Sequence, residues 1–157
     1  MDEKREFLRH AVATLGYRSR KVLTDPPSGF SSCRACESGR SAGEILAHVC
    51  DLFDWGLALA DGRHVWRDTK PRAWDEDVTR FYTVLAAFDA RLAAAAPLGH
   101  PAERLFQGPG ADALTHIGQM AMLRRIAGTP IRGENYFAAD IAAGRGGPGQ
   151  AAPAVEF

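Results

Sequence analysis

The stretch Ser41–Leu59, "SAGEILAHVCDLFDWGLAL", carries the clearest structural signal in this chain. Ser41 can cap the free backbone N–H groups at a helix start, and Glu44, three residues later, can bond back to it. The positions that follow repeat at a spacing of three and four, as on one face of an α-helix: Ile45, His48, Leu52, Trp55 and Leu59. The stretch therefore predicts a helix with one buried face, and it places His48 in the middle of that face.

Three other segments predict helices by the same reasoning. One covers about residues 2–24 and ends before two consecutive prolines, which cannot continue a helix. Another covers about residues 74–96, and the last runs from about Gly110 to Ala127. Because no stretch alternates as a strand does, and the helical stripes suit nearly antiparallel packing, we expect an all-α four-helix bundle. The loops between the first three helices are long enough for a crossover, which favours an up-down-down-up topology.

The length of the chain, 157 residues, corresponds to a single domain. We expect the bundle to occupy residues 1–143. Residues 144–157 are rich in Gly, Pro and Ala and contain few large apolar groups, so burial offers little to offset the entropy of ordering them. This segment is predicted to be a flexible C-terminal tail.

Charge and composition argue against some classes of partner. The 19 basic and 19 acidic side chains balance, so no net field attracts nucleic acid or an anionic membrane. No stretch reaches the roughly 20 apolar residues that a membrane span needs, and the charged first residues do not resemble a secretion signal. We therefore expect a cytoplasmic protein without a nucleic-acid or membrane partner.

The chain contains three cysteines, an odd number that does not suit a disulfide framework. Cys33 and Cys36 form a C-x-x-C pattern, which is typical of a redox pair or of half a zinc site, but no second pair completes a zinc sphere. The simplest interpretation is that both cysteines are reduced thiols in a surface loop. Cys50 lies within the second predicted helix and is expected to be a small buried residue.

A second stretch, Asp112–Arg125, "DALTHIGQMAMLRR", contains two residues with metal-binding chemistry. Asp112 and His116 are four residues apart, so on a helix they lie one turn above each other on the same face. His48 belongs to another helix, and ligand sites in bundles are built from inward side chains on facing helices. Without a metal, Asp112 would favour the helix N-terminus and His48 would be an ordinary core histidine.

The segments "GRSAGEILAHVCDLFDW" (39–55) and "DALTHIGQMAMLRRIAGTPIRGENY" (112–136) resemble the DinB-like (YfiT-like) four-helix-bundle proteins, a large group regarded as metalloenzymes. That family has one metal-binding histidine on the second helix and an H-x-x-x-H pair at the start of the fourth, followed by Gly-Gln. His48 matches the first histidine, and His116, with Gly118 and Gln119 after it, matches the later one of the pair. Asp112 stands where the family has the earlier histidine, so the resemblance implies a site of two histidines and one carboxylate.

The implied cofactor is a divalent metal ion, zinc or nickel, and the carboxylate extends the range to iron and manganese. Three protein ligands leave coordination positions open, as in catalytic sites. Glu44 lies one turn before His48 and Asp51 three residues after it, which makes both of them candidate general bases or hydrogen-bond partners of the ligands.

The resemblance implies a metal-dependent enzyme that acts on a small molecule, as an S-transferase, isomerase or hydrolase. Characterised relatives include enzymes that use a bacterial low-molecular-weight thiol, and many members form homodimers. An alternative from another class is a non-catalytic bundle, dimerising or binding a small ligand, that has lost the metal site; the departure at Asp112 supports it. A third hypothesis is redox or metal sensing through Cys33 and Cys36.

Overall fold

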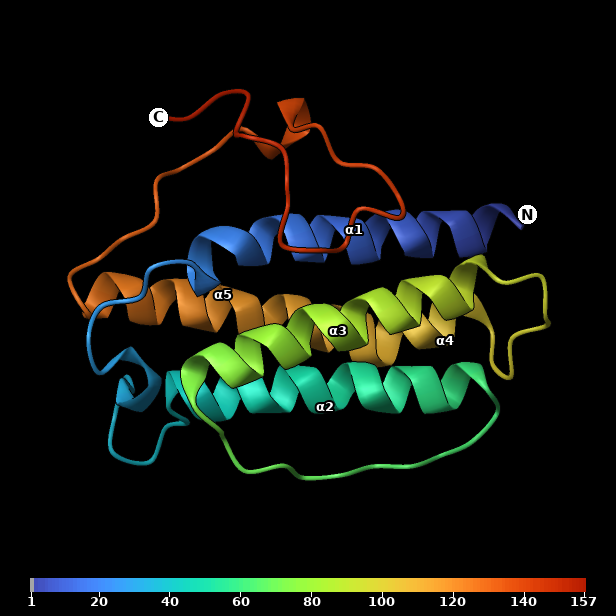
Figure 1. Cartoon of the computed structure of the whole chain (residues 1–157), viewed down its shortest axis with the longest axis horizontal. Coiled ribbons are helices and arrows are strands. Elements are labelled where there is room, and N and C mark those ends of the chain that lie inside the picture. The colour runs from blue at the N-terminus through green and yellow to red at the C-terminus, as the bar shows by residue number, and fades with distance from the viewer. Residues whose placement is uncertain (1) are drawn as a thin grey trace.

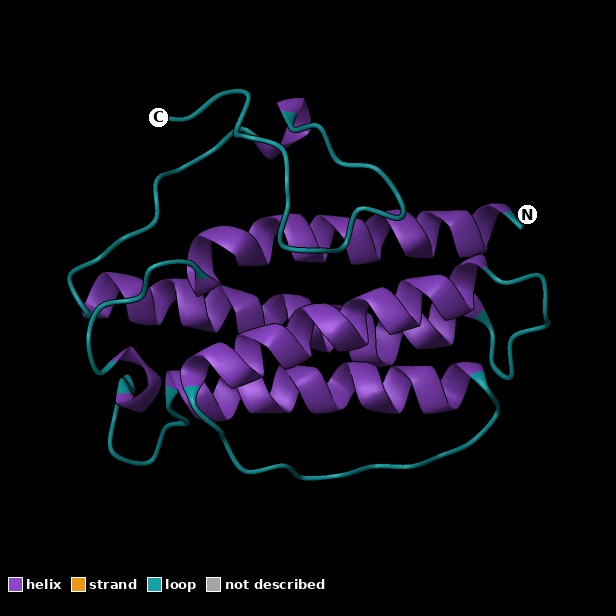
Figure 2. Ribbon diagram, in the orientation of Figure 1, coloured by secondary structure: helices purple, strands orange, loops and turns teal. Residues whose placement is uncertain are grey.

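The computed structural model describes residues 2–157, and within that range its regular structure is helical. Three long helices are uninterrupted α-helices. A fourth is formed by two α-helical segments and the π-helical turn between them. The elements are α1 (Glu3–Leu23), α2 (Ala42–Ala60), α3 (Trp74–Ala93), α4 (Ala102–Leu105), a π-helical turn (Phe106–Gly110) and α5 (Ala111–Ile126). Figures 1 and 2 show these helices as a bundle with loops at both ends. The predicted all-α bundle of four helices is confirmed.

α2 and α3 run in the same direction. The connection 61–73, which links the end of α2 to the start of α3, therefore runs back along the length of the bundle (Figure 1). Ion pairs show this order: Arg80 contacts Asp51 and Asp54, and eleven residues later Arg91 contacts Asp61.

α1 is antiparallel to both α2 and α3 and parallel to α5. Lys4 pairs with Glu103 at one end of the bundle, whereas Arg124 donates to the carbonyl oxygen of Thr24 at the other end. The helices therefore follow an up-down-down-up order, in which α2 and α5 are antiparallel neighbours (Figure 1).

The start of α2 forms as its sequence predicts. The Ser41 N–H donates to Glu44 Oε2 at 2.6 Å, and the Glu44 N–H donates to Ser41 Oγ at 3.3 Å. This reciprocal capping box satisfies two of the backbone donors that a helix start leaves free. The residue at which α2 starts is thus set by local chemistry.

The core of the bundle lies between the four long helices. Its most deeply buried side chains come from every helix: Leu8, Leu15, Leu46, Phe53, Phe81, Leu85, Phe88, Leu105 and Met120. On α2 the fully buried positions include Leu46, Val49 and Phe53. The prediction that His48 lies in the middle of the buried face is therefore wrong. His48 is at the edge of that face because the core-facing direction of α2 is rotated by about one residue from the predicted stripe.

The last helix begins at Ala102, eight residues before the predicted start. The sequence "GPG" at 108–110 was expected to precede the helix, but the π-helical turn takes these residues into it. Pro109 packs against Gly56 of α2, where a Cβ atom would lie 3.1 Å from Pro109 Cγ. A glycine at position 56 therefore permits a close approach between α2 and the turn that precedes α5.

The segment after α5 lies over α1 in Figure 1. An isolated bridge joins Glu134 to Glu156, and Lys21 of α1 pairs with Glu156 at 2.6 Å. These contacts place part of residues 144–157 beside the bundle. The predicted flexibility of this tail concerns its motion and stays a prediction.

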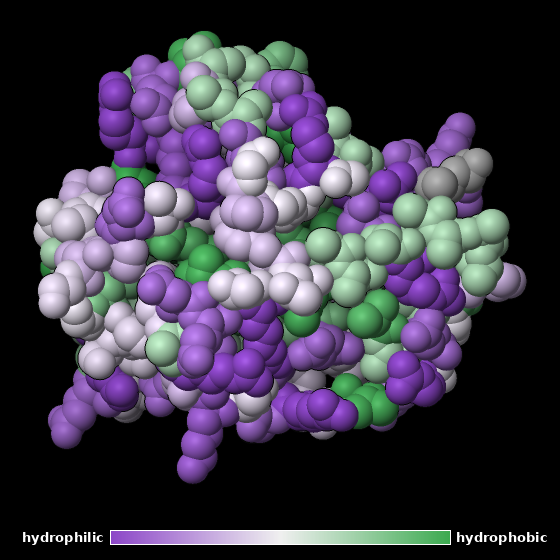
Figure 3. Space-filling view, in the orientation of Figure 1, coloured by the Kyte–Doolittle hydropathy of each residue, from purple (hydrophilic) through white to green (hydrophobic). Residues whose placement is uncertain are grey.

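The face of the molecule seen in Figure 3 is mostly hydrophilic, with hydrophobic side chains in separate small patches. Within residues 2–157, none of the helices combines the length and the apolar character that a membrane crossing requires.

Candidate metal centre

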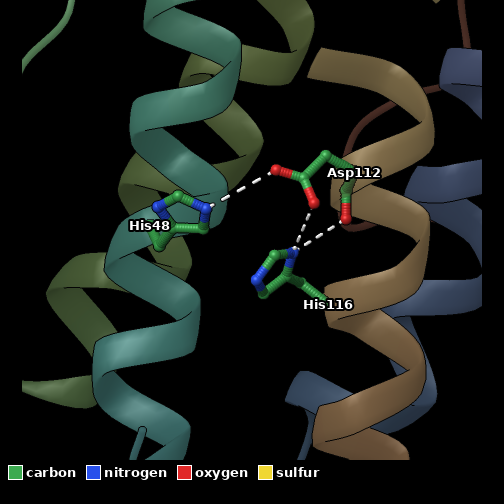
Figure 4. A group of neighbouring side chains, drawn as sticks. All are labelled: His48, Asp112 and His116. Carbon is green, nitrogen blue, oxygen red and sulfur yellow. Dashed lines mark hydrogen bonds and ion pairs between the residues drawn. The ribbon is translucent and has the colours of Figure 1, made fainter. Parts of the chain in front are cut away.

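The structure brings His48, Asp112 and His116 together between α2 and α5. One nitrogen or oxygen atom from each of the three lies within 4.8 Å of the others. His48 Nε2 is 3.7 Å from Asp112 Oδ2, and His116 Nδ1 is 3.2 Å from Asp112 Oδ1. Figure 4 shows the Asp112 carboxylate between the two imidazole rings, one carried by each helix. Antiparallel packing of α2 and α5 therefore assembles the group that the sequence predicted.

The π-helical turn positions the α5 half of this cluster. It ends at Gly110, so Asp112 falls in the first turn of α5 and His116 in the second. Extra residues in one helical turn are found frequently at functional sites, because they reorient the side chains that follow. Because the last helix is continuous from Ala102, Asp112 lies inside it and not at its N-terminus, so the predicted stabilisation of this aspartate by a helix start does not apply.

The distances are compatible with a divalent ion. Metal bonds of 2.0–2.2 Å hold neighbouring ligand atoms roughly 3.3 Å apart in a tetrahedral site. The 3.7 Å between Asp112 Oδ2 and His48 Nε2 is slightly longer than this value, whereas the 3.2 Å from Asp112 Oδ1 to His116 is measured to Nδ1, the nitrogen that also contacts the Asp112 carbonyl oxygen. Small side-chain rotations would bring all three groups to bonding distance. The donor set, two imidazoles and one carboxylate, fits a divalent metal and does not identify which one.

The second ring nitrogen of each histidine has a different environment. His116 Nδ1 also lies 2.9 Å from the Asp112 carbonyl oxygen, so a proton on Nδ1 would leave Nε2 free to bind a metal. Metal-binding histidines commonly donate their other N–H to a backbone carbonyl in this way. His48 Nδ1, in contrast, is buried and has no hydrogen-bond partner within residues 2–157. His116 is therefore the better oriented of the two rings.

The pKa of His48 lies below its ordinary value. Burial is the main cause, and the positive charge of Arg40 and the nearby His116 act in the same direction, against the opposing effect of Asp112. The neutral ring, which can offer a lone pair to a metal, is thus the favoured form at neutral pH.

A pocket of about 400 Å³ lies on the solvent side of α2, and His48 lines it. Glu44 and Asp51, the two predicted catalytic residues, line the same pocket, together with Arg40 and Lys70 at its rim. His48 therefore faces Asp112 on one side and a solvent-connected cavity on the other.

Both predicted bases are already held by other groups. Glu44 accepts the Ser41 N–H, and this bond is the main reason why its pKa is lowered. Asp51 is buried, accepts the Thr69 N–H at 2.8 Å and pairs with Arg80 at 2.6 Å. These contacts fasten the connection 61–73 to α2. Asp51 is thus fixed in the pocket wall, and a catalytic role for either residue stays a prediction.

The sequence indicates Trp66, in the long connection 61–73, only as core or cavity lining, and the structure places it against the metal centre. Trp66 makes an edge contact with His48, with ring centroids 5.6 Å apart, and it contacts Trp55 in the same manner at 5.8 Å. The only signal in the sequence was an aromatic residue in an otherwise polar loop. Its position depends on where the loop crosses α2, which the spacing of residues does not reveal.

Cys33, Cys36 and Cys50 are free thiols. Cys36 is exposed and Cys33 partly so, as the surface-loop interpretation predicts. Cys50 is fully buried, and burial raises the pKa of its thiol to about 12.

Comparisons of the chain with family models, with curated proteins and with solved structures found no match.

Proposed function

We propose that His48, Asp112 and His116 bind one divalent metal ion and that this ion is the centre of an enzyme active site. The observation that carries the proposal is the convergence of three donor groups, from two helices, within 4.8 Å. Two of the donors are one helical turn apart, so a single pairing of α2 with α5 completes the set.

The chemistry of the donors limits the metal. Two imidazoles suit zinc and nickel, whereas the carboxylate adds a hard oxygen that also suits iron and manganese. Two histidines with one carboxylate is the ligand set of many non-haem iron sites as well. Zinc or nickel is the first expectation because the resemblance to the DinB-like proteins supports it.

The proposed reaction class follows from the open coordination positions. A metal with three protein ligands polarises a bound oxygen or sulfur and lowers the pKa of that group. The chain's own residues hold the site: His48 is kept neutral by burial, and the Trp66 ring limits the space beside it. The pocket lined by His48, Glu44 and Asp51 gives room for a small substrate. A low-molecular-weight thiol as co-substrate, and a homodimer, are proposed from the family resemblance alone.

A second candidate function is a non-catalytic helical bundle without metal. The observation that favours it is the Asp112 side chain, which is 45% exposed and contacts both histidines, so the three side chains are partners of one another without a metal.

Metal analysis separates the two functions. Protein purified without chelator should contain about one divalent ion per chain, and removal of the ion should lower the melting temperature. His116→Ala should lose the ion, whereas His10→Ala, which removes an exposed histidine of α1, should retain it. Full occupancy in His116→Ala would contradict the ligand assignment. If the purified protein contains no metal, and added zinc, nickel, iron or manganese leaves its melting temperature unchanged, the non-catalytic candidate is favoured.

A further inference from the structure

A second pocket, of about 410 Å³, lies where α1 and α5 end and the chain turns back over α1. Four cationic side chains line it: Arg20, Lys21, Arg124 and Arg132. Its acidic lining residues are Asp25 and Glu156, and the buried Glu134 also pairs with Lys21, so one positive charge remains in excess although the whole chain is neutral. We call this site the basic pocket.

The basic pocket is separate from the candidate metal centre. Arg124 follows His116 by eight residues, a rise of roughly 12 Å along α5. Residues of α1, of α5 and of the segment after α5 line the basic pocket, whereas His48 belongs to α2, which lies across the bundle from α1 in Figure 1. A ligand in one site would not touch the residues of the other.

Helix capping explains only part of this charge. Arg124 is buried, and its Nε and Nη1 donate to the carbonyl oxygens of Thr129, Thr24 and Asp25. Cations near helix C-termini are favourable, so this arrangement stabilises the ends of α1 and α5. Arg124 Nη2, however, makes no hydrogen bond within residues 2–157 and is not shielded from solvent. One nitrogen of a buried guanidinium that lines the pocket, Nη2, therefore keeps its N–H donors free.

Two of the four cations lack a carboxylate partner. Lys21 pairs with Glu134 and Glu156, and Arg132 pairs with Glu156 at 3.2 Å. Within the described residues, neither Arg124 nor Arg20 has an ion pair. The Arg20 Nη1 donates a hydrogen bond of 3.5 Å to the Gln150 carbonyl oxygen. A buried cation without a counter-charge is costly, and a bound anion would compensate it.

We propose that the basic pocket binds a small phosphate-bearing anion. A phosphate group carries a charge of about −1.5 to −2 at neutral pH, which suits a site with two cations that have no carboxylate partner, Arg20 and Arg124. Guanidinium N–H groups are strong donors to phosphate oxygens, and Arg20 and the Nη2 of Arg124 can donate without giving up a carboxylate. Arg124 is oriented before binding, because it is held by three carbonyl oxygens and lies 5.7 Å from the centre of the Phe30 ring.

Calorimetric titration tests this proposal with two ligands, inorganic phosphate and glycerol phosphate, in a chloride buffer of low ionic strength. Saturable binding at one site is expected. Arg20→Gln should weaken it about tenfold, the amount expected for one charge-assisted bond. Arg125→Gln is the matched control, because Arg125 is exposed in the same turn of α5 and does not line the pocket. Its affinity should stay within about twofold of the wild type.

The two ligands distinguish the source of the phosphate group. Tighter binding of glycerol phosphate would identify an organic phosphate as the ligand, and equal binding would identify the inorganic ion. The absence of saturable binding up to about 10 mM of either ligand would overturn the proposal. So would an equal loss in Arg125→Gln, or tighter binding of a short DNA duplex. His116→Ala should bind phosphate like the wild type, so the outcome does not depend on the metal.

Discussion

Two clusters of partly buried ionisable side chains in the bundle differ in how completely their members are paired. In the first, the candidate metal centre, the Asp112 carboxylate is half-exposed and His48 Nδ1 has no partner within residues 2–157. In the second, which we call the α1 clamp, Tyr17 and Lys21 of α1 contact Glu134 and Glu156 of the returning chain.

The α1 clamp is closed. Glu134 has no exposed side-chain surface, its Oε1 accepts the Tyr17 hydroxyl, and its Oε2 lies 2.8 Å from Lys21 Nζ in a geometry that suits an ion pair better than a hydrogen bond. A closed cluster of this kind holds segments together, whereas an open one keeps the ability to bind a ligand. The two clusters should therefore respond differently to substitution: the α1 clamp in stability, and the metal centre in metal affinity.

The largest effect is expected for Lys21→Met. It leaves the Glu134 carboxylate buried without its cation, and the loss of one partner of a buried ion pair costs about 3 kcal/mol or more of unfolding free energy. Urea denaturation followed by circular dichroism measures this change. Lys4 lies in α1 like Lys21, but its ion pair with Glu103 of α4 is exposed. Lys4→Met should therefore leave the unfolding free energy nearly unchanged. Equal effects of the two substitutions would contradict the closed description of the α1 clamp.

Asp112→Asn should have the opposite profile to Lys21→Met, with a large effect on metal binding and a small effect on stability. The metal affinity is expected to fall about 100-fold, because an amide oxygen is a much weaker ligand than a carboxylate, while metal-free stability changes by less than about 1 kcal/mol. Competition with a chromogenic chelator measures the affinity. Asp75→Asn is the control, since Asp75 is an exposed aspartate in the first turn of α3. Unaltered metal binding in Asp112→Asn would remove the carboxylate from the ligand set.

The alkaline limit of stability should depend on Tyr17. Burial, followed by the bond to Glu134, raises the pKa of its phenol from 10.0 to about 12. The unfolded chain therefore loses this proton first, and the stabilisation is complete below pH 10 and disappears as the pH rises toward 12.

Tyr17→Phe should lower the unfolding free energy by about 1.5 kcal/mol at neutral pH, because one bond to a carboxylate is lost. It should also flatten the decline in stability between pH 10 and pH 12. Denaturation at several pH values checks both effects. A decline as steep as in the wild type would assign the alkaline limit to another group.

The smallest effect is expected for Glu156→Gln. Its side chain is partly exposed, and Lys21 keeps its pair with Glu134. The urea midpoint should move less than in Tyr17→Phe, because exposed ion pairs contribute little. A larger shift would mean that Glu156, and not Glu134, is the main partner of Lys21.

Local sequence chemistry was sufficient to predict the helices. The capping box at Ser41 and the prolines after α1 act within a few residues, and they set helix limits that the structure reproduces. The extension of the last helix to Ala102 was not predictable in this way, because Gly108 and Pro109 indicate a break unless a π-helical turn packs against Gly56.

The sequence by itself determined the all-helical fold, the limits of most helices and the three residues with metal-binding chemistry, since these depend on neighbours three or four positions apart. Tertiary structure alone decided that His48 lies at the edge of the core, that Trp66 lies against it, and that four cations meet where α1 and α5 end. These features depend on how helices rotate and where long connections cross, and the packing of residues far apart in the chain controls both.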